Sequence, residues 1–199
     1  MSALLEIPVC ILAGGQSRRF GSNKALALLA GKPLVVHVLD RISSQTQAPI
    51  AINCDDAKAL SGLGRPIVLD HTWISEGPLC GIFAAIVLAK AQGYDDVVTV
   101  AVDLPCLPED LIRTLSNACA PCVAASQTRW HPVNGLWATS QVRDLDDYLR
   151  SGRRSAHGWA KYCRAKIAEF DNQVGGFDPF YNINTLGDLQ HLARNQSRY

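Results

Sequence analysis

Residues 9–42 read VCILAGGQSRRFGSNKALALLAGKPLVVHVLDRI. A short apolar run stops at two adjacent glycines, and a loop rich in arginine, lysine and further glycine follows. A helical pattern then begins at Pro33, a residue type that fits the first turn of a helix. Apolar strand, glycine-rich basic loop and helix, in this order, predict the first unit of a layered α/β fold with a ligand-binding loop between strand and helix.

The rest of the chain continues this alternation of apolar runs and helical patterns. The predicted strands are 7–12, 49–54, 66–70, 96–102, 122–126, 133–138 and 166–170. The predicted helices are 33–45, 57–62, 78–92, 108–118, 141–151, 155–163 and a closing helix capped by Asn184 or Thr185. Continuous Val/Ile-rich strands predict a single Rossmann-like, doubly wound α/β fold, in which helices cover both faces of a mostly parallel sheet. No linker or repeat interrupts the pattern, so we expect one domain over residues 1–199.

The composition suits a packed protein with no strong overall charge. Hydrophobic residues make up 48% of the 199 residues, charged residues 19%, and the formal net charge is +1. This balance argues against disorder and against a general nucleic-acid or membrane-surface binder. No apolar run reaches the roughly 20 residues of a membrane span, and the amino terminus lacks a signal-peptide pattern. We expect a cytoplasmic protein without nucleic-acid or membrane partners.

The chain contains seven cysteines, most of them inside apolar segments. An odd count in such positions is typical of reduced thiols that serve as small core residues. Cys119 and Cys122 form a C-x-x-C pair, which leaves a redox or metal role open. A zinc site needs a second pair of ligands, and no second pair occurs at matching spacing.

The loop after the first strand has the chemistry of a phosphate site. Gly14 and Gly15 let the backbone approach a phosphate closely. Arg18, Arg19 and Lys24 can neutralise several phosphate charges. The glycine spacing matches neither the Walker loop nor the dinucleotide-binding fingerprint. The alternative is a tight turn whose basic side chains are simply solvated.

Three polar residues stand where predicted strands end. Asp103 follows the strand at 96–102, and its carboxylate suits Mg²⁺, which prefers oxygen ligands shared with substrate phosphates. Asp70 and Asn53 end two neighbouring strands in the same way. Because ligands bind outside the carboxyl ends of parallel strands, the three side chains are candidates for one crevice. The alternatives are a helix cap at Asp103 and ordinary strand-end polar residues at the other two positions.

The segment GPLCGIFAAI places small residues at the start of a predicted helix. Gly77, Pro78 and Gly81 would allow close packing there, or leave backbone amides open toward a nucleobase. A plain helix amino terminus is the alternative, because small residues are common at such positions.

Two basic segments lie in the second half of the chain. TRWHPVNGLW supplies Arg129, His131 and Asn134 before a predicted strand, and SGRRSAHGW supplies Arg153, Arg154 and His157. Both segments suit an anionic partner, and a solvated basic turn is the alternative for each.

The motif L-A-G-G-x-S-x-R-[MF]-G-x-[DN]-K-A, followed by G-K-P-L, resembles the nucleotidyltransferase signature of the molybdenum cofactor guanylyltransferases, the MobA proteins. Phe20 and Asn23 depart from the usual Met and Asp, and neither change removes a cation. The resemblance implies catalytic roles for Arg19, Lys24 and Asp103, with Mg²⁺ on Asp103. It implies GTP contacts at Leu12, Ala13, Gly14, Gly15, Lys24, Asn53, Asp70, Gly77, Pro78, Leu79, Gly81 and Asp103.

The closing segment FYNINTLGDLQ resembles the family's N-[IV]-N-T-x-x-[DE]-L pattern. The resemblance implies acceptor contacts at His131, Asn134, Arg153, Arg154, Asn182 and Asn184, with Asn182 as a candidate neighbour of Asp103. Residues 1–120 would then form a nucleotide-binding half, and residues 121–199 an acceptor-binding half.

The activity that the resemblance implies is transfer of GMP from GTP to the terminal phosphate of molybdopterin, in its free or molybdenum-loaded form. The products would be the guanine dinucleotide cofactor and pyrophosphate, and the partners would include proteins that make or receive the cofactor. The alternatives are a molybdopterin cytidylyltransferase, a sugar-phosphate nucleotidyltransferase of the same fold, and a non-catalytic nucleotide or cofactor carrier.

Overall fold

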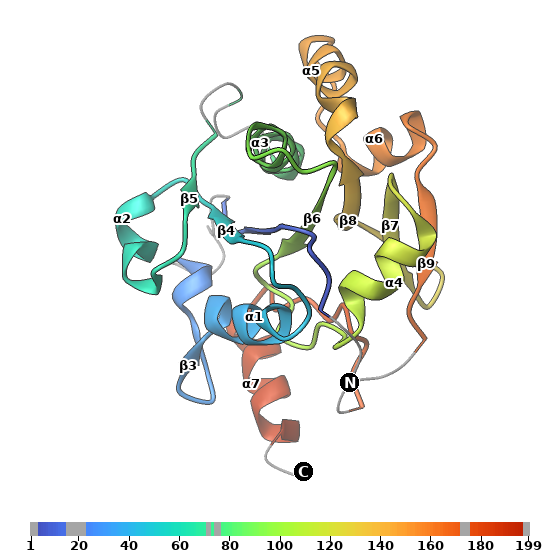
Figure 1. Cartoon of the computed structure of the whole chain (residues 1–199). Helices are drawn as coiled ribbons and strands as arrows, with labels where there is room; N and C mark the ends of the chain where they lie inside the picture. The colour runs from blue at the N-terminus through green and yellow to red at the C-terminus, as the bar shows by residue number, and fades with distance from the viewer. Residues whose placement is uncertain (1–3, 15–22, 71–72, 74–76, 172–175, 197–199) are drawn as a thin grey trace.

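A seven-stranded sheet runs through the protein and takes strands from both halves of the sequence (Figure 1). The computed structural model describes residues 4–14, 23–70, 73, 77–171 and 176–196. In sheet order the strands are β5 (Ile67–Val68), β4 (Ile50–Asn53), β1 (Val9–Leu12), β6 (Asp96–Ala101), β8 (Arg129–Ala138), β7 (Cys122–Ser126) and β9 (Lys166–Glu169). Within this sheet the described pairings are parallel except the two made by β8, which are antiparallel. The mostly parallel α/β sheet expected from the sequence is therefore confirmed.

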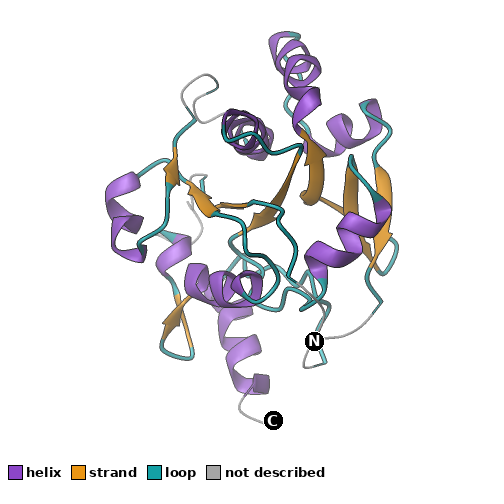
Figure 2. Cartoon of the chain, in the orientation of Figure 1, coloured by secondary structure: helices purple, strands orange, loops and turns teal. Residues whose placement is uncertain are grey.

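Helices cover both faces of this sheet (Figure 2). The helices on one face are α3 (Pro78–Ala91), α5 (Val142–Arg150) and α6 (Ala156–Tyr162). Those on the other side are α1 (Leu34–Ser43), α4 (Leu111–Ala118) and α7 (Leu186–Gln196). The short helix α2 (Ala57–Leu60) links β4 to β5, and 3-10 turns occupy Lys24–Leu26, Ser61–Leu63 and Thr139–Gln141. Among the described helices, none combines the length and apolar character that a membrane span requires.

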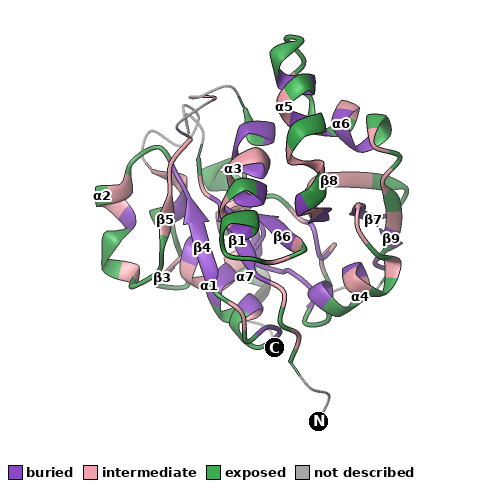
Figure 3. Ribbon diagram, turned by 45° about the horizontal axis from the view of Figure 1, so that its top comes forward, coloured by how far each residue is buried: buried purple, intermediate pink, exposed green. Residues whose placement is uncertain are grey.

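Burial on both faces explains why the central strands are apolar throughout (Figure 3). Along β1, Val9 and Ile11 pack toward the α1 side, whereas Cys10 and Leu12 pack toward α3. Alternate side chains of a strand point to opposite faces, so a strand covered on both faces shows no polar alternation. The first strand therefore reads as a continuous apolar run.

The region before α1 differs from the sequence expectation. Leu28–Leu29 (β2) and Lys32–Pro33 (β3) form a small antiparallel hairpin that the sequence did not suggest. Its turn is made by Ala30 and Gly31, both with positive φ angles of 50° and 78°. Pro33 belongs to β3, so it precedes the first residue of α1 and does not lie inside the helix.

The start of α4 also differs from expectation. The helix begins at Leu111 and not at Pro108, because the residues between them form a turn. Buried Gln45 holds this turn: its Nε2 donates to the carbonyl oxygen of Pro108 (2.8 Å), and its Oε1 accepts from the backbone N–H of Ile112 (3.0 Å). A side chain 67 residues away in the chain thus caps the helix.

Strand β8 begins four residues earlier than predicted, at Arg129, and it contains Pro132. Proline lacks the N–H needed for a sheet ladder and is accepted in strands at bulges. The pairing with β7 steps from Ala124↔His131 to Val123↔Gly135, so three residues of β8 bulge out at this point. The bulge accommodates Pro132 within the strand.

Side chains replace the missing ladder at this bulge. The hydroxyl of Thr99 donates to the carbonyl oxygen of Val133 (2.7 Å), and the Oδ1 of Asn134 accepts from the backbone N–H of Ala101 (2.9 Å). Thr99 is fully buried and Asn134 is 4% exposed, so both groups need these partners. The carboxyl end of β6 is fixed in this way, two residues before Asp103.

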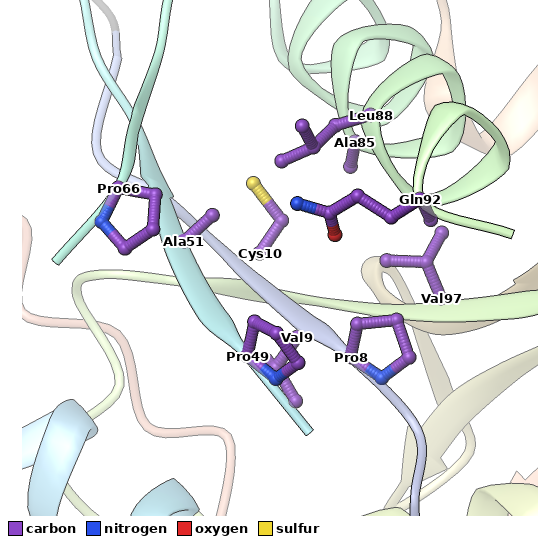
Figure 4. A pocket seen from close by; sticks show the side chains of 11 residues that line it. Pro8, Val9, Cys10, Pro49, Ala51, Pro66, Ala85, Leu88, Gln92 and Val97 are labelled. Carbon is purple, nitrogen blue, oxygen red and sulfur yellow. The ribbon is translucent and has the colours of Figure 1, made fainter. Parts of the chain in front are cut away.

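An apolar pocket lies at the amino edge of the sheet, between the starts of the strands and α3 (Figure 4). Pro8 and Pro49 line its lower side and Pro66 its left side, and Cys10 lies between the strands and the helix. Burial raises the pKa of Cys10 to about 12, so its thiol stays protonated at neutral pH. All seven cysteines are free, and Cys119 and Cys122 form no disulfide.

The hairpin between β7 and β8 provides a test of local strain. Its two turn residues, Gln127 and Thr128, have φ angles of 45° and 68°, a region that β-branched residues rarely adopt. Thr128→Gly should raise the free energy of unfolding by about 0.5 to 1 kcal/mol, because the left-handed penalty exceeds the entropic cost of glycine. Urea unfolding measures the change. Thr128→Ala keeps the Cβ atom and should gain less, and an equal gain would refute strain as the cause.

Candidate functional site

The carboxyl ends of β1, β4, β5 and β6 meet at one edge of the sheet. Leu12 pairs with Asn53 on one side and with Ala101 on the other. The backbone N–H of Ala13 then donates to the carbonyl oxygen of Asn53 (2.7 Å), so the first residue past β1 is still tied to β4. Gly14 follows and is exposed at this edge. Three residues of the basic loop, Gly15, Arg18 and Arg19, lie outside the described residues.

Asn53 connects three segments beneath this edge. Its Nδ2 donates to the carboxylate of Asp70 (2.7 Å) and to the carbonyl oxygen of Val68 (3.1 Å), which fixes the end of β5. Its Oδ1 faces the first turn of α3, where a Cβ atom built on Gly81 would lie only 2.6 Å away. The side chain is 2% exposed. Asn53 and Asp70 therefore lie together at the strand ends, as the sequence predicted for their positions.

The turn into α3 brings small residues to the same edge. Gly77 has a φ of +95°, which favours glycine, and Pro78 occupies the first position of the helix. Leu79 is fully buried in the core beneath, and Gly81 leaves no room for a Cβ atom beside Asn53 and Leu12. The backbone thus passes close to the strand ends, with Gly77 and Pro78 exposed there.

A second group of polar residues lies at the end of β6. The ammonium group of Lys24 donates to the carboxylate of Asp103 (2.7 Å) and to the Oδ1 of Asn184 (2.9 Å). The side chains of Lys24 and Asp103 are 16% and 19% exposed, so the pair is partly shielded from water. The backbone N–H of Ile183 donates to the carbonyl oxygen of Asp103 (3.0 Å). Asn182, beside it, is exposed next to the backbone of Asp103.

The closing helix settles which residue is its cap. The hydroxyl of Thr185 accepts from the backbone N–H of Asp188 (3.1 Å), and the Asp188 carboxylate accepts from the N–H groups of Asn184 and Thr185. This is a reciprocal capping box. Thr185 is the cap, so the side chain of Asn184 remains for Lys24.

Aromatic rings hold the basic residues that follow α5. The guanidinium of Arg153 lies 4.2 Å from the ring centre of Tyr148 and 5.1 Å from that of Tyr162. That of Arg154 lies 5.1 Å from Trp73, which comes from the segment after β5. Such contacts restrict long side chains to one region. The sequence suggested both arginines but not Trp73, because nothing local links a lone tryptophan to arginines some 80 residues later.

His131 and Asn134 both lie within β8. Asn134 is buried and holds the end of β6, so the structure gives it a positioning role, and its contact with an acceptor stays a prediction. His131 stacks on Phe180 with ring centres 4.5 Å apart, and its Nε2 lies 2.8 Å from the hydroxyl of Ser126. The pKa of His131 is lowered, chiefly because burial disfavours the charged ring.

Comparisons with known proteins give the family of this chain. The family model described as "MobA-like NTP transferase domain" matches residues 9–166. The chain belongs to the MobA-like NTP transferase family. It is 37% identical to a molybdenum cofactor guanylyltransferase from Rhizobium leguminosarum, covering 95% of this chain and 92% of the relative. It is 38% identical to one from Cereibacter sphaeroides, with 90% and 91% covered.

Solved structures place the MobA-like chain in the nucleotidyltransferase fold. Molybdopterin-guanine dinucleotide biosynthesis protein A from Archaeoglobus fulgidus superposes with a TM-score of 0.72 at 23% identity, over 97% of this chain and 100% of the other. A CMP:2-keto-3-deoxy-manno-octonic acid synthetase, solved with CTP, gives 0.64 at 12% identity over 98% and 99%. At these identities the likeness concerns the fold. The family membership makes this protein a nucleotidyltransferase.

The contact between Gly81 and Asn53 yields a prediction. Gly81→Ala should lower the free energy of unfolding by about 1 to 3 kcal/mol, because the new methyl group forces Asn53 from its place beside Asp70. Urea unfolding measures this loss of stability, and the affinity for nucleotide should fall as well. Gly62→Ala is the matched control, because open space surrounds that glycine. Equal stabilities of the two variants would contradict the close contact.

Proposed function

We propose that this protein transfers GMP from GTP to the terminal phosphate of molybdopterin, free or molybdenum-loaded. The products are molybdopterin guanine dinucleotide and pyrophosphate. The observation that carries the proposal is the meeting of Lys24, Asp103 and Asn184 at the carboxyl edge of the sheet, between the strand-end residues and the closing segment. The two relatives cover at least nine-tenths of the chain, and their names support GTP and molybdopterin as the substrates.

The chemistry needs no covalent intermediate with the protein. A phosphate oxygen of the acceptor attacks the α-phosphorus of GTP in line, and the bond to the leaving pyrophosphate breaks as the new bond forms. The protein has to hold both substrates and stabilise the negative charge that spreads over the transferred group. We assign that stabilisation to Lys24 and Arg19, with the backbone of Gly14 and Gly15 against the phosphates.

The residues at the end of β6 fit a magnesium ion. Asp103 offers a partly exposed carboxylate, and Asn184 offers an amide oxygen close to the same point. Mg²⁺ commonly takes one or two carboxylates and completes its shell with water and substrate phosphates. When bound, the ion would neutralise phosphate charge. Asp103 would be its principal protein ligand, while Lys24 carries a second positive charge beside it.

The guanine end of GTP belongs, in this proposal, beside β1 and the start of α3. Leu12, Ala13 and Gly14 would lie on one side of the base, and residues 77–81 on the other. Asn53 and Asp70 support both from below through their hydrogen bond. Exposed backbone groups at Gly14, Gly77 and Pro78 are suited to read the edge of a base.

In this proposal the two halves of the chain bind different substrates. Residues 1–120 bind the nucleotide and residues 121–199 the acceptor, within a single domain. His131, Asn134, Arg153, Arg154, Asn182 and Asn184 are the residues we assign to the acceptor side. The protein acts in the cytoplasm, together with proteins that make or receive the molybdenum cofactor.

Pyrophosphate release distinguishes this function from its rivals. The protein is incubated with GTP, CTP, ATP or UTP, with Mg²⁺, and with or without molybdopterin in its free or molybdenum-loaded form. The expected result is release with GTP and with none of the other three nucleotides, and only when molybdopterin is present. Release with CTP would move the protein to cytidylyl transfer. Tight GTP binding without any release would indicate a carrier.

Asp103→Ala should nearly abolish pyrophosphate release in the presence of Mg²⁺. The reason is loss of the carboxylate at the metal position, and the fold should remain because this side chain is partly exposed. Circular dichroism checks folding and the release assay checks activity. A folded variant with normal turnover would remove Asp103 from the metal site.

Lys24→Ala should weaken GTP binding by about 1.5 to 3 kcal/mol, the range of a charge-assisted contact. Isothermal titration with GTP and Mg²⁺ measures the change. Lys90→Ala serves as the control, because Lys90 is exposed in the last turn of α3, at the opposite edge of the sheet. Unchanged affinity in the Lys24 variant would exclude this residue from the triphosphate site.

A further inference from the structure

Three polar side chains meet at the part of the carboxyl edge that residues 121–199 form. Only one of them, His131, was suggested by the sequence. Ser126 ends β7, His131 lies near the start of β8, and Asp178 comes from the closing segment. The Oγ of Ser126 lies 2.9 Å from each carboxylate oxygen of Asp178 and 2.8 Å from the Nε2 of His131. Ser126 is 1% exposed, so its hydroxyl depends on these two partners.

The directions of these hydrogen bonds follow from the proton inventory. A carboxylate can only accept, and a serine hydroxyl carries one proton. Ser126 therefore donates to Asp178, and its oxygen is left to accept from His131. The Nε2 of His131 must then carry a proton. In a neutral imidazole the other nitrogen, Nδ1, is a bare acceptor.

The neutral form of the ring agrees with its surroundings. The pKa of His131 is lowered because burial disfavours the charged ring and Arg129 repels it, while Asp178 acts in the opposite direction. The ring is also fixed in place, since it stacks on Phe180 at an interplanar angle of 14°. The backbone N–H of Phe180 donates to the Oδ1 of Asp178 (2.7 Å), so one short segment positions both the ring and the carboxylate.

The same segment leads directly to the ligands proposed for GTP. Phe180 lies against His131, and Asn184, four residues later, contacts Lys24. An extended chain advances at most about 3.6 Å per residue, so these two residues are no more than roughly 14 Å apart. His131 and Lys24 therefore both contact this short segment, and an acceptor lying along it would pass from one to the other.

We propose that Asp178, acting through Ser126, is a positioning residue that fixes His131 as the Nε2–H tautomer, with Nδ1 accepting a hydrogen bond from an O–H or N–H donor of the acceptor substrate. The identity of the acceptor rests on the proposed function, whereas the tautomer does not. On this view His131 recognises a donor group of the acceptor, and it does not act as one more cation for the acceptor's phosphate.

Asp178→Asn tests the tautomer directly. The amide can keep its Oδ1 on the N–H of Phe180, which turns Nδ2 toward Ser126. The serine oxygen then accepts a hydrogen bond from Nδ2, and its O–H donates to Nε2, so the neutral imidazole should carry its proton on Nδ1. Long-range ¹H–¹⁵N NMR of the free protein, without substrate, identifies the protonated nitrogen. A wild-type ring protonated at Nδ1 and bare at Nε2 would overturn the proposal.

Kinetics test the role toward the acceptor. In Asp178→Asn the kcat/KM for molybdopterin should fall about 10- to 100-fold, as for loss of one directed hydrogen bond to a polar or charged group. The KM for GTP should change less than about twofold. Ser126→Ala should show the same selective loss, and it serves as a second variant if Asp178→Asn folds poorly. Asp171→Asn, at an exposed position after β9, should have no effect.

The outcomes separate this inference from the proposed function. A reversed tautomer with unchanged kcat/KM for molybdopterin would refute the positioning role and leave guanylyl transfer intact. An equal loss for both substrates would also refute it, because a purely structural defect is not selective. A wild-type protein inactive with every nucleotide would refute the proposed function, while the NMR result would still decide the tautomer.

Discussion

The ion pair between Lys24 and Asp103 joins two segments that are 79 residues apart at the edge where the parallel strands end. Partly shielded pairs of this kind contribute little net stability, because the loss of hydration offsets much of the attraction. What the pair does is hold a cation and an anion in contact at the place where a phosphate and a metal are proposed to bind. The sheet order, with β1 beside β6, is what brings the two residues there.

Carboxamide side chains support this edge at three points. Asn53 ties the ends of β4 and β5, Asn134 holds the end of β6, and Asn184 accepts from Lys24. An amide offers both a donor and an acceptor without charge, so it can substitute for backbone partners that a strand no longer provides. The charged groups of the site are thus supported from below by neutral hydrogen bonds, which leave the local field to Lys24, Asp103 and the ligands.

The elements with strong local patterns could be predicted from the sequence. The strand at 122–126 has the predicted bounds, and the central strands differ by a few residues at their ends. The hairpin at Leu28–Pro33 was missed because neither strand exceeds two residues, too short for a periodic signal. The start of β8 was predicted four residues too late, because nothing in the sequence indicates that a bulge accommodates Pro132.

The parts of the site that depend on distant contacts could not be predicted in the same way. Asp70 and Asn53 were placed correctly at neighbouring strand ends because strand topology alone brings them there. Ser126 and Asp178 are 52 residues apart, and neither stands in a pattern that marks function. The sequence also gave no reason to separate the roles of Asn184 and Thr185, which only the capping box distinguishes.

The contact of Asn184 with Lys24 has a consequence for the order in which the protein is made. The two residues are 160 positions apart in the sequence. At about 5 to 20 residues per second, the ribosome therefore adds Lys24 roughly 8 to 32 s before it adds Asn184. Throughout that interval the nascent chain lacks the closing segment that supplies Asp178, Phe180 and Asn184. The loop that carries Lys24 is among the first parts synthesised, yet the edge proposed to bind the substrates is assembled only at the end of translation.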